Sequence, residues 1–134
     1  MAIKKKYSKE IINRIEKLNF EFKIWFKYNN QNIIGDGWSK LLQTIKENDG
    51  KSLLKASEIC NYSYKYAWSI LKRIEERTGI PAVSIGRGGH GGGGWVKLNQ
   101  WGEILLNLYI EFKKFSKIQL QNYFIELRSS IIKF

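Results

Sequence analysis

The stretch SLLKASEICNYSYKYAWSILKRIEERTG, residues 52–79, predicts two helices joined by a tight turn. Ser52 is a suitable N-cap, because a serine side chain accepts a hydrogen bond from the first turn of the helix that it precedes. Residues 61–63 interrupt the helical spacing of the apolar side chains, and the spacing resumes over residues 64–77 until Thr78-Gly79 ends it. The stretch is therefore predicted to be a helix-turn-helix motif.

Two β-prone runs follow, over residues 82–85 and 95–98, on either side of residues 86–94. This loop contains seven of the twelve glycines, so we expect a hairpin with a glycine-rich tip. A helix capped by Asn99 is then predicted to continue almost to Phe134. Its predicted inward residues are Trp101, Ile104, Leu105, Leu108, Phe112 and Phe115.

The first part of the chain predicts a helix and a hairpin. Residues 4–18 carry an apolar stripe at helical spacing, and residues 20–28 alternate apolar and polar side chains as a half-buried strand does. Residues 29–32 predict a turn, after which Ile33-Ile34 returns as the second strand. Asp36 is predicted to cap the helix that precedes the motif.

The predicted elements occur in the order of a winged helix-turn-helix: helix, helix, turn, helix, strand, loop, strand and helix. We expect an α+β, mostly α fold in one domain, residues 1–134. Its core would be residues 36–112, with a helix and a hairpin in residues 1–35 and a long C-terminal helix in residues 99–134.

The composition predicts a basic protein with an anionic partner. The 134 residues have a formal net charge of +11, and residues 51–98 contribute the largest share, +5. Such a charge attracts nucleic acid or an anionic membrane surface, and the alternative is a charged surface that only keeps the protein in solution. One Cys and one His provide neither a disulfide framework nor a structural zinc site, so no metal and no cofactor are expected. No signal peptide or membrane span is expected either, which favours a cytoplasmic, nucleoid-associated protein.

At about 100° per residue, the helix over residues 64–77 turns an apolar side inward and a cationic side outward. The inward residues are Ala67, Ile70, Leu71, Ile74 and Thr78, and the outward residues are Lys65, Ser69, Lys72, Arg73 and Glu76. Lys65 and Arg73 can donate to guanine O6 and N7, whereas Lys72 suits a phosphate. Ser63 and Tyr64 can donate to phosphate oxygens beside the positive end of the helix dipole.

Three of these side chains also have purely structural interpretations. Ser63 can cap the helix without contacting DNA, and Tyr64 can pack against the protein. Trp68 lies at the border of the apolar side, and we expect it in the core.

The glycine-rich loop has two interpretations. Residues 86–91 fit the dinucleotide-binding pattern GxGxxG, but that motif needs a following helix and a strand is predicted here, so nucleotide binding is rejected. A glycine-rich tip instead lets backbone N–H groups approach phosphate, with Arg87, His90 and Lys97 as donors or charges. The predicted DNA-binding residues are therefore Ser63, Tyr64, Lys65, Ser69, Lys72, Arg73, Arg87, His90 and Lys97, and no catalytic residue is predicted.

Four segments resemble the N-terminal domain of ModE, the molybdate-responsive transcription regulator whose winged helix is similar to that of LysR-type regulators. They are GKSLLKASEI (50–59), SYKYAW (63–68), GGHGGGG (88–94) and LNQWG (98–102). The resemblance covers about residues 20–112. Ser57, His90 and Asn99 depart from the family pattern.

The resemblance implies binding to double-stranded DNA as a homodimer through helices that flank the winged helix. Their counterparts here are residues 4–18 and 103–134, whose apolar stripes exceed what one small core requires. The alternative is that these helices pack only on their own domain. The chain has no room for molybdate-binding domains, so oxyanion sensing is not expected. No small-molecule ligand is evident from the residues, and the sequence leaves any effector open.

The sequence therefore favours a sequence-specific transcription regulator. The alternative is an architectural protein that coats DNA with little sequence preference. An enzyme is not expected, because no Ser/His/Asp set, carboxylate pair or metal cluster stands out. Binding of the lysine-rich residues 4–18 to a membrane surface is a further alternative.

Overall fold

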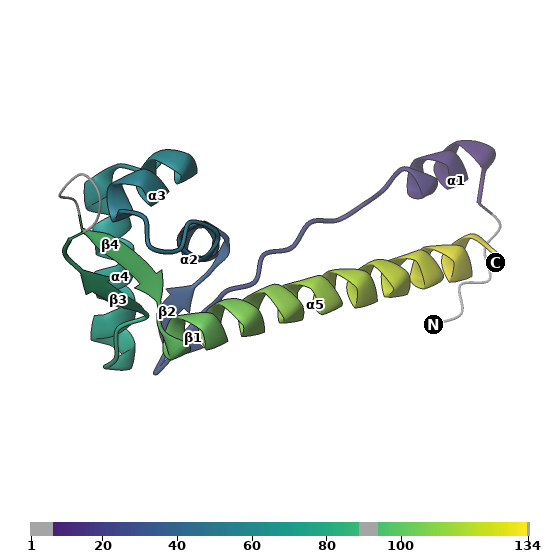
Figure 1. The fold of residues 1–134 in the computed structure, drawn as a ribbon. Helices are drawn as coiled ribbons and strands as arrows, with labels where there is room; N and C mark the ends of the chain where they lie inside the picture. Colours follow the sequence, from purple (N-terminus) through teal and green to yellow (C-terminus); the bar gives the residue numbers. More distant parts are fainter. Residues whose placement is uncertain (1–6, 89–93, 134) are drawn as a thin grey trace. The chain divides into compact units, whose positions relative to one another are not determined.

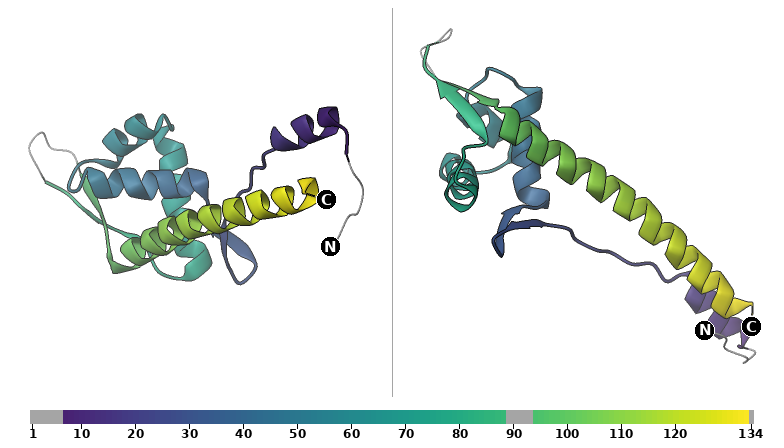
Figure 2. Two further views of the ribbon diagram at one scale, coloured as in Figure 1. Left: turned by 90° about the vertical axis from the view of Figure 1, so that its right-hand side faces the viewer. Right: turned by 90° about the horizontal axis from the view of Figure 1, so that it is seen from below.

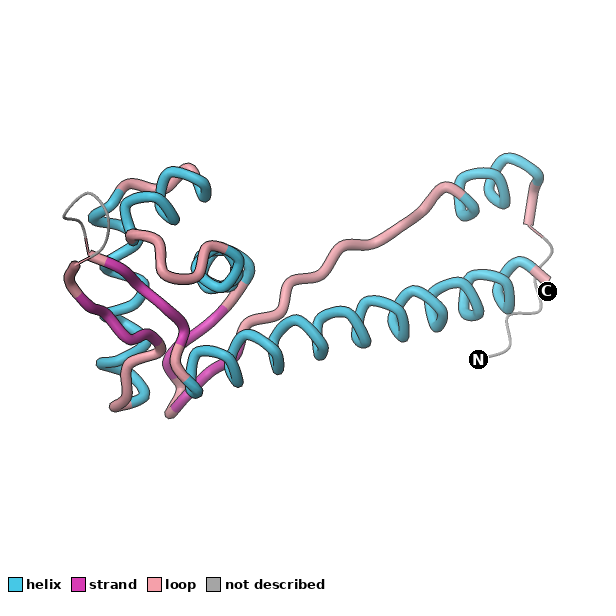
Figure 3. Tube along the Cα trace, viewed as in Figure 1, coloured by secondary structure: helices cyan, strands magenta, loops and turns pink. Residues whose placement is uncertain are grey.

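The computed structural model describes residues 7–88 and 94–133, which form an α+β, mostly helical structure, as the sequence predicts (Figures 1 and 3). The elements are α1 (Lys9–Glu16), β1 (Phe26–Tyr28), β2 (Gln31–Ile34), α2 (Asp36–Glu47), α3 (Leu53–Cys60), α4 (Tyr64–Thr78), β3 (Val83–Gly86), β4 (Trp95–Leu98) and α5 (Gln100–Ile132). The chain divides into two compact units, one of residues 23–111 and one of residues 1–22 with 112–134. Among the residues described, no helix combines the length and apolar character needed to span a bilayer.

In the unit of residues 23–111, β1 and β2 form an antiparallel hairpin in which Tyr28 pairs with Gln31. The two residues between them, Asn29 and Asn30, have φ values of 47° and 65°. This left-handed conformation is what a two-residue hairpin turn requires, and asparagine tolerates it better than most residues do. The predicted turn and returning strand are therefore confirmed.

The strand predicted over residues 20–28 is formed only at Phe26–Tyr28. Residues 20–25 alternate between partly buried and exposed, as the sequence predicts, but no strand of the described ranges pairs with them. The length of β2 explains the difference, because its ladder with β1 ends where Ile34 meets Phe26 and α2 begins two residues later. Alternation predicts an extended segment, whereas a strand also needs a partner.

Three predicted N-caps in this unit are confirmed and one is wrong. Ser52, Ser63 and Asn99 accept hydrogen bonds from the backbone N–H groups of Lys55, Tyr66 and Gly102 at 3.1, 3.0 and 2.9 Å. The N-cap of α2 is Gly35, and Asp36 lies inside the first turn. There its carboxylate accepts a hydrogen bond from the hydroxyl of Tyr109 at 2.7 Å. The side chain predicted to cap α2 is therefore used in a contact with α5 instead.

A short turn joins α3 to α4. Asn61 ends α3 in the left-handed conformation, with φ of 62°, and the Tyr62 hydroxyl donates to the carbonyl of Gly37 at 2.9 Å. Burial raises the pKa of Tyr62 above its ordinary value, which widens the pH range over which the phenol can donate this hydrogen bond. Helix α4 ends at Thr78, one residue later than predicted, with Gly79 as its C-cap.

The core of residues 23–111 is one apolar cluster built from β2, both hairpin strands β3 and β4, and the helices α2 to α5 (Figure 2). Its fully enclosed residues include Ile34, Leu41, Leu42, Ile45, Cys60, Ile70, Ile74, Leu106 and Tyr109. Helices α3 and α4 thus present one side each to this cluster, which determines which of their side chains remain outside.

The side of α5 that enters the core differs in part from the prediction. Leu105 is buried and Trp101 is partly buried, but Ile104, Leu108, Phe112 and Phe115 are exposed. Gly102, Leu106 and Tyr109 are buried in their place. A Cβ atom on Gly102 would lie 2.1 Å from the carbonyl oxygen of Ala82, so the helix backbone approaches that carbonyl directly. This contact is possible only with glycine, and it turns the other apolar side of α5 outward.

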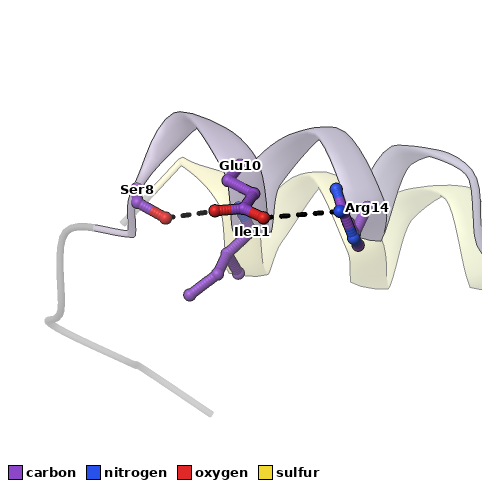
Figure 4. A network of polar contacts seen from close by, with 4 residues as sticks. All are labelled: Ser8, Glu10, Ile11 and Arg14. Carbon is purple, nitrogen blue, oxygen red and sulfur yellow. Dashed lines mark hydrogen bonds and ion pairs between the residues drawn. The ribbon is translucent and has the colours of Figure 1, made fainter.

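The unit of residues 1–22 and 112–134 contains α1, which is shorter than the predicted helix over residues 4–18; residues 1–6 lie outside the described ranges. Ser8 caps α1 by accepting from the Ile11 N–H at 3.3 Å, and Glu10 pairs with Arg14 at 3.3 Å (Figure 4). At the other end, Arg128 donates to the carbonyls of Glu16 and Leu18 at 3.1 and 2.8 Å. No residue of α1 is buried, so polar contacts and partial packing hold it.

Candidate nucleic-acid interface

Helix α4 has one side in the core and the other in solvent, as its helical spacing predicts. The buried side chains are Ala67, Ile70, Leu71, Ile74 and Thr78. Lys65, Lys72, Arg73 and Glu76 are exposed on the opposite side. Ser69 is partly buried and donates to the Tyr66 carbonyl at 2.7 Å, so its hydroxyl proton is already in use. The predicted orientation of this helix is confirmed.

The outward cations of α4 have no role inside the protein. The side chains of Lys65, Lys72 and Arg73 form no hydrogen bond or ion pair with any residue that the structure describes. Arg77, one turn after Arg73, is different, because it donates to the carbonyl of Asn32 and lies 5.6 Å from the ring centroid of Trp38. Three cations of α4 are therefore available to an external anion, whereas Arg77 links α4 to β2 and α2.

The N-terminal end of α4 is open to solvent. Ser63 is occupied as the N-cap, while Tyr64 is exposed and meets Trp68 edge-on, with ring centroids 6.3 Å apart. Trp68 is 38% exposed, so the expectation that it lies in the core is wrong. Residues of α3 and of the hairpin β3–β4 line the same hollow as Trp68.

Strands β3 and β4 form an antiparallel hairpin beside α3 and α4 (Figures 1 and 2). Ile85 pairs with Val96 and Val83 with Leu98, so these four side chains share one face of the hairpin. Val83 and Val96 on this face are buried in the core, whereas Ile85 is 53% exposed. Lys97 pairs with Ser84 on the other face and is exposed. The alternation of the hairpin thus places Lys97 outside.

An aromatic side chain orients Lys97. Its Nζ lies 5.5 Å from the ring centroid of Trp95, within the range of a cation–π interaction. The Trp95 ring in turn lies across Gly86, where a Cβ atom would be 2.2 Å from the indole. Arg87 is exposed, and His90 lies outside the described residues, so the structure gives no position for it.

Lys51 lies beside Lys97 of β4, although the sequence pattern did not predict it as a DNA-binding residue. Its backbone carbonyl accepts a hydrogen bond from the Val96 N–H at 2.9 Å, which joins the turn before α3 to β4. A Cβ atom on the neighbouring Gly50 would lie 3.6 Å from Cε of Lys97. Two exposed lysines, Lys51 and Lys97, therefore flank the same turn. Only a long-range backbone contact brings them together, so no local pattern could have indicated it.

The described residues contain no cluster of three or more His, Cys, Asp or Glu side chains that could bind a metal ion. What the geometry offers is an exposed helix face with free cations, which is suited to hydrogen bonding with phosphates and base edges. Comparison of the sequence with models of protein families found no match, and comparison with curated proteins found no similar sequence.

Proposed function

We propose that this protein is a sequence-specific, DNA-binding transcription regulator of the winged helix-turn-helix class, similar to the ModE N-terminal domain. In this proposal α4 enters the major groove and the hairpin β3–β4 is the wing that contacts the flanking backbone. The observation that carries the proposal is the free cationic side of α4, where Lys65, Lys72 and Arg73 have no partner among the described residues. Unpaired cations have no internal hydrogen bond or ion pair to break before they bind an anion.

Individual residues have separate roles in this proposal. Arg73 and Lys65 donate to guanine in the groove, while Lys72 and the wing residues Arg87 and Lys97 neutralise phosphates. Tyr64 is exposed at the positive end of α4, where its hydroxyl can donate to a phosphate oxygen.

Alanine substitution tests the assignment of the α4 face. Arg73→Ala and Lys65→Ala are each expected to weaken specific binding by about 1–3 kcal/mol, measured by mobility shift on sites selected from random DNA. Lys27→Ala is the control, because Lys27 is an exposed lysine that lies on β1 and not on α4 or the hairpin β3–β4. Equal affinities of all three variants and the parent protein would show that α4 is not the helix that contacts the bases.

A homodimer is part of the proposal, and the exposed apolar side of α5 supports it. Leu108, Phe112, Phe115 and Ile118 recur at helical spacing, and Phe115 is 61% exposed. A second copy that covered this stripe would present two α4 helices to successive major grooves, about 34 Å apart on DNA. Sedimentation equilibrium should give a dimer for the parent protein and a monomer for Phe115→Glu, and a monomeric parent protein would refute this part.

The net charge of +11 also favours the second candidate, an architectural protein that coats DNA. A salt titration on a selected site and on random DNA separates the two functions. A specific regulator keeps a preference of about 10³-fold or more for the selected site, whereas a coating protein binds both DNAs alike.

A further inference from the structure

A cavity opens between the N-terminal ends of α3 and α4 and the hairpin β3–β4, and its volume is about 450 Å³. Proteins bind small molecules in cavities of about 300–1,000 Å³. Ser52, the N-cap of α3, and Leu54 in its first turn line one side. Tyr64 and Trp68 line it from α4, and Ile85 and Trp95 from the hairpin. All six belong to the unit of residues 23–111.

The lining is apolar and yet open. Leu54, Tyr64 and Ile85 are 51%, 46% and 53% exposed, while the adjacent core residues Leu53 and Val96 are buried. An occupant that covers these apolar side chains gains about 25 cal/mol in binding free energy for each Å² of apolar surface removed from water. The core does not depend on this hollow, since its own residues are already enclosed.

Two aromatic rings of α4 favour an aromatic occupant. Tyr64 and Trp68 meet edge-on on one wall of the cavity, and Trp95 lines the wall formed by β4. An aromatic guest gains about 0.5–1.5 kcal/mol from each offset or edge-on ring contact, beyond the area that it buries. An aliphatic guest has no such gain.

Two hydroxyl groups can orient a heteroatom on the guest. The Tyr64 hydroxyl has no hydrogen-bond partner among the described residues. Ser52 accepts from the Lys55 N–H at 3.1 Å, so its own proton remains available for donation. We propose that this cavity binds a small planar aromatic molecule of one or two fused rings that carries a hydrogen-bonding heteroatom. The site does not depend on the proposed DNA binding, and its test contains no DNA.

Indole is the probe, and the five tryptophans of the 134 residues are the reporters. In NMR spectra of the ¹⁵N-labelled protein, the side-chain N–H signals of Trp68 and Trp95 should shift and saturate with a Kd of about 1 mM or tighter. The signal of Trp25, which is exposed but does not line the cavity, should not move. Equal shifts of Trp25 and Trp68, or no saturation up to about 10 mM, would overturn the proposal.

Two matched variants on α3 complete the test. Leu54→Gln places an amide in the cavity and should weaken indole binding about tenfold. Ile59→Gln is the control, because Ile59 is equally exposed on the same helix but does not line the cavity. Equal indole affinities of the two variants would overturn the proposal. Shifts of Trp68 and Trp95 on dilution of the protein alone would overturn it too, because a second copy would then occupy the cavity.

Discussion

Replacing Gly102 with alanine tests whether α5 is held by direct contact of its backbone with Ala82. The added Cβ atom would lie 2.1 Å from the carbonyl oxygen of Ala82 and 3.1 Å from its carbonyl carbon. Carbon and oxygen atoms approach no closer than about 3.3 Å in ordinary contacts. The first turn of α5 therefore has to move by about 1 Å, and the oxygen cannot yield alone because it belongs to the main chain.

The free-energy cost of this movement depends on the buried residues of α5 and on its N-terminal cap. Leu106 and Tyr109 are almost completely buried, so shifting them disturbs a packed core, which costs about 1–3 kcal/mol. The shift also strains the cap in which Asn99 accepts from the Gly102 N–H at 2.9 Å, an interaction worth about 1 kcal/mol. Alanine is a better helix former than glycine and returns about 0.5–1 kcal/mol. We expect a net loss of about 2 kcal/mol in the free energy of unfolding.

Urea unfolding followed by far-ultraviolet circular dichroism measures this loss as a lower midpoint at an unchanged slope. The matched control is Gly37→Ala in α2, where the nearest atom to the new Cβ is the Tyr62 hydroxyl oxygen at 3.4 Å, an ordinary contact. That variant should be as stable as the parent protein or slightly more stable. If Gly102→Ala unfolds at the same midpoint as Gly37→Ala, the backbone contact does not hold α5.

Three further substitutions test separate contacts. Burial, followed by the hydrogen bond to Asp36, raises the pKa of Tyr109 above its ordinary value of 10.0, so the folded state retains a proton that the unfolded state loses above pH 10. The contribution of this group to stability is complete below pH 10 and falls as the pH rises. Tyr109→Phe should therefore be about 1–2 kcal/mol less stable than the parent protein at pH 8, and in urea titrations from pH 9 to 11 its stability should fall less steeply. An equal slope for the two proteins would contradict the assignment. Ser63→Ala should lower the free energy of unfolding by about 1 kcal/mol through loss of the α4 cap, and an unchanged midpoint would show that the cap contributes nothing. Gly86→Ala should displace the indole of Trp95 and shift its side-chain N–H signal in NMR while changing stability by less than about 1 kcal/mol, and an unmoved signal would mean that the ring does not lie on Gly86.

Much of the candidate interface was predictable, because it depends on one amphipathic helix. The spacing of apolar residues in α4 separates a buried from an exposed side without any knowledge of the partners, and three of its four cations lie on the exposed side, namely Lys65, Lys72 and Arg73. The placement of Lys51 beside Lys97 was not predictable, because it depends on a hydrogen bond between the turn before α3 and β4. Trp68 shows the same limit, because its exposure depends on how far neighbouring elements extend over it.

Local sequence by itself determined the elements from α2 to β4, the caps at Ser52, Ser63 and Asn99, and the two sides of α4. Each of these follows from interactions within a few residues, such as a serine side chain that meets the next backbone N–H. Only the tertiary structure decided which side of α5 is buried and where β1 begins. Helix α5 carries apolar residues around most of its circumference, so periodicity allows several buried sides, and close contact between Gly102 and Ala82 selects one. Strand β1 likewise begins only where β2 supplies a partner, since the hydrogen bonds of a strand are made by another part of the chain.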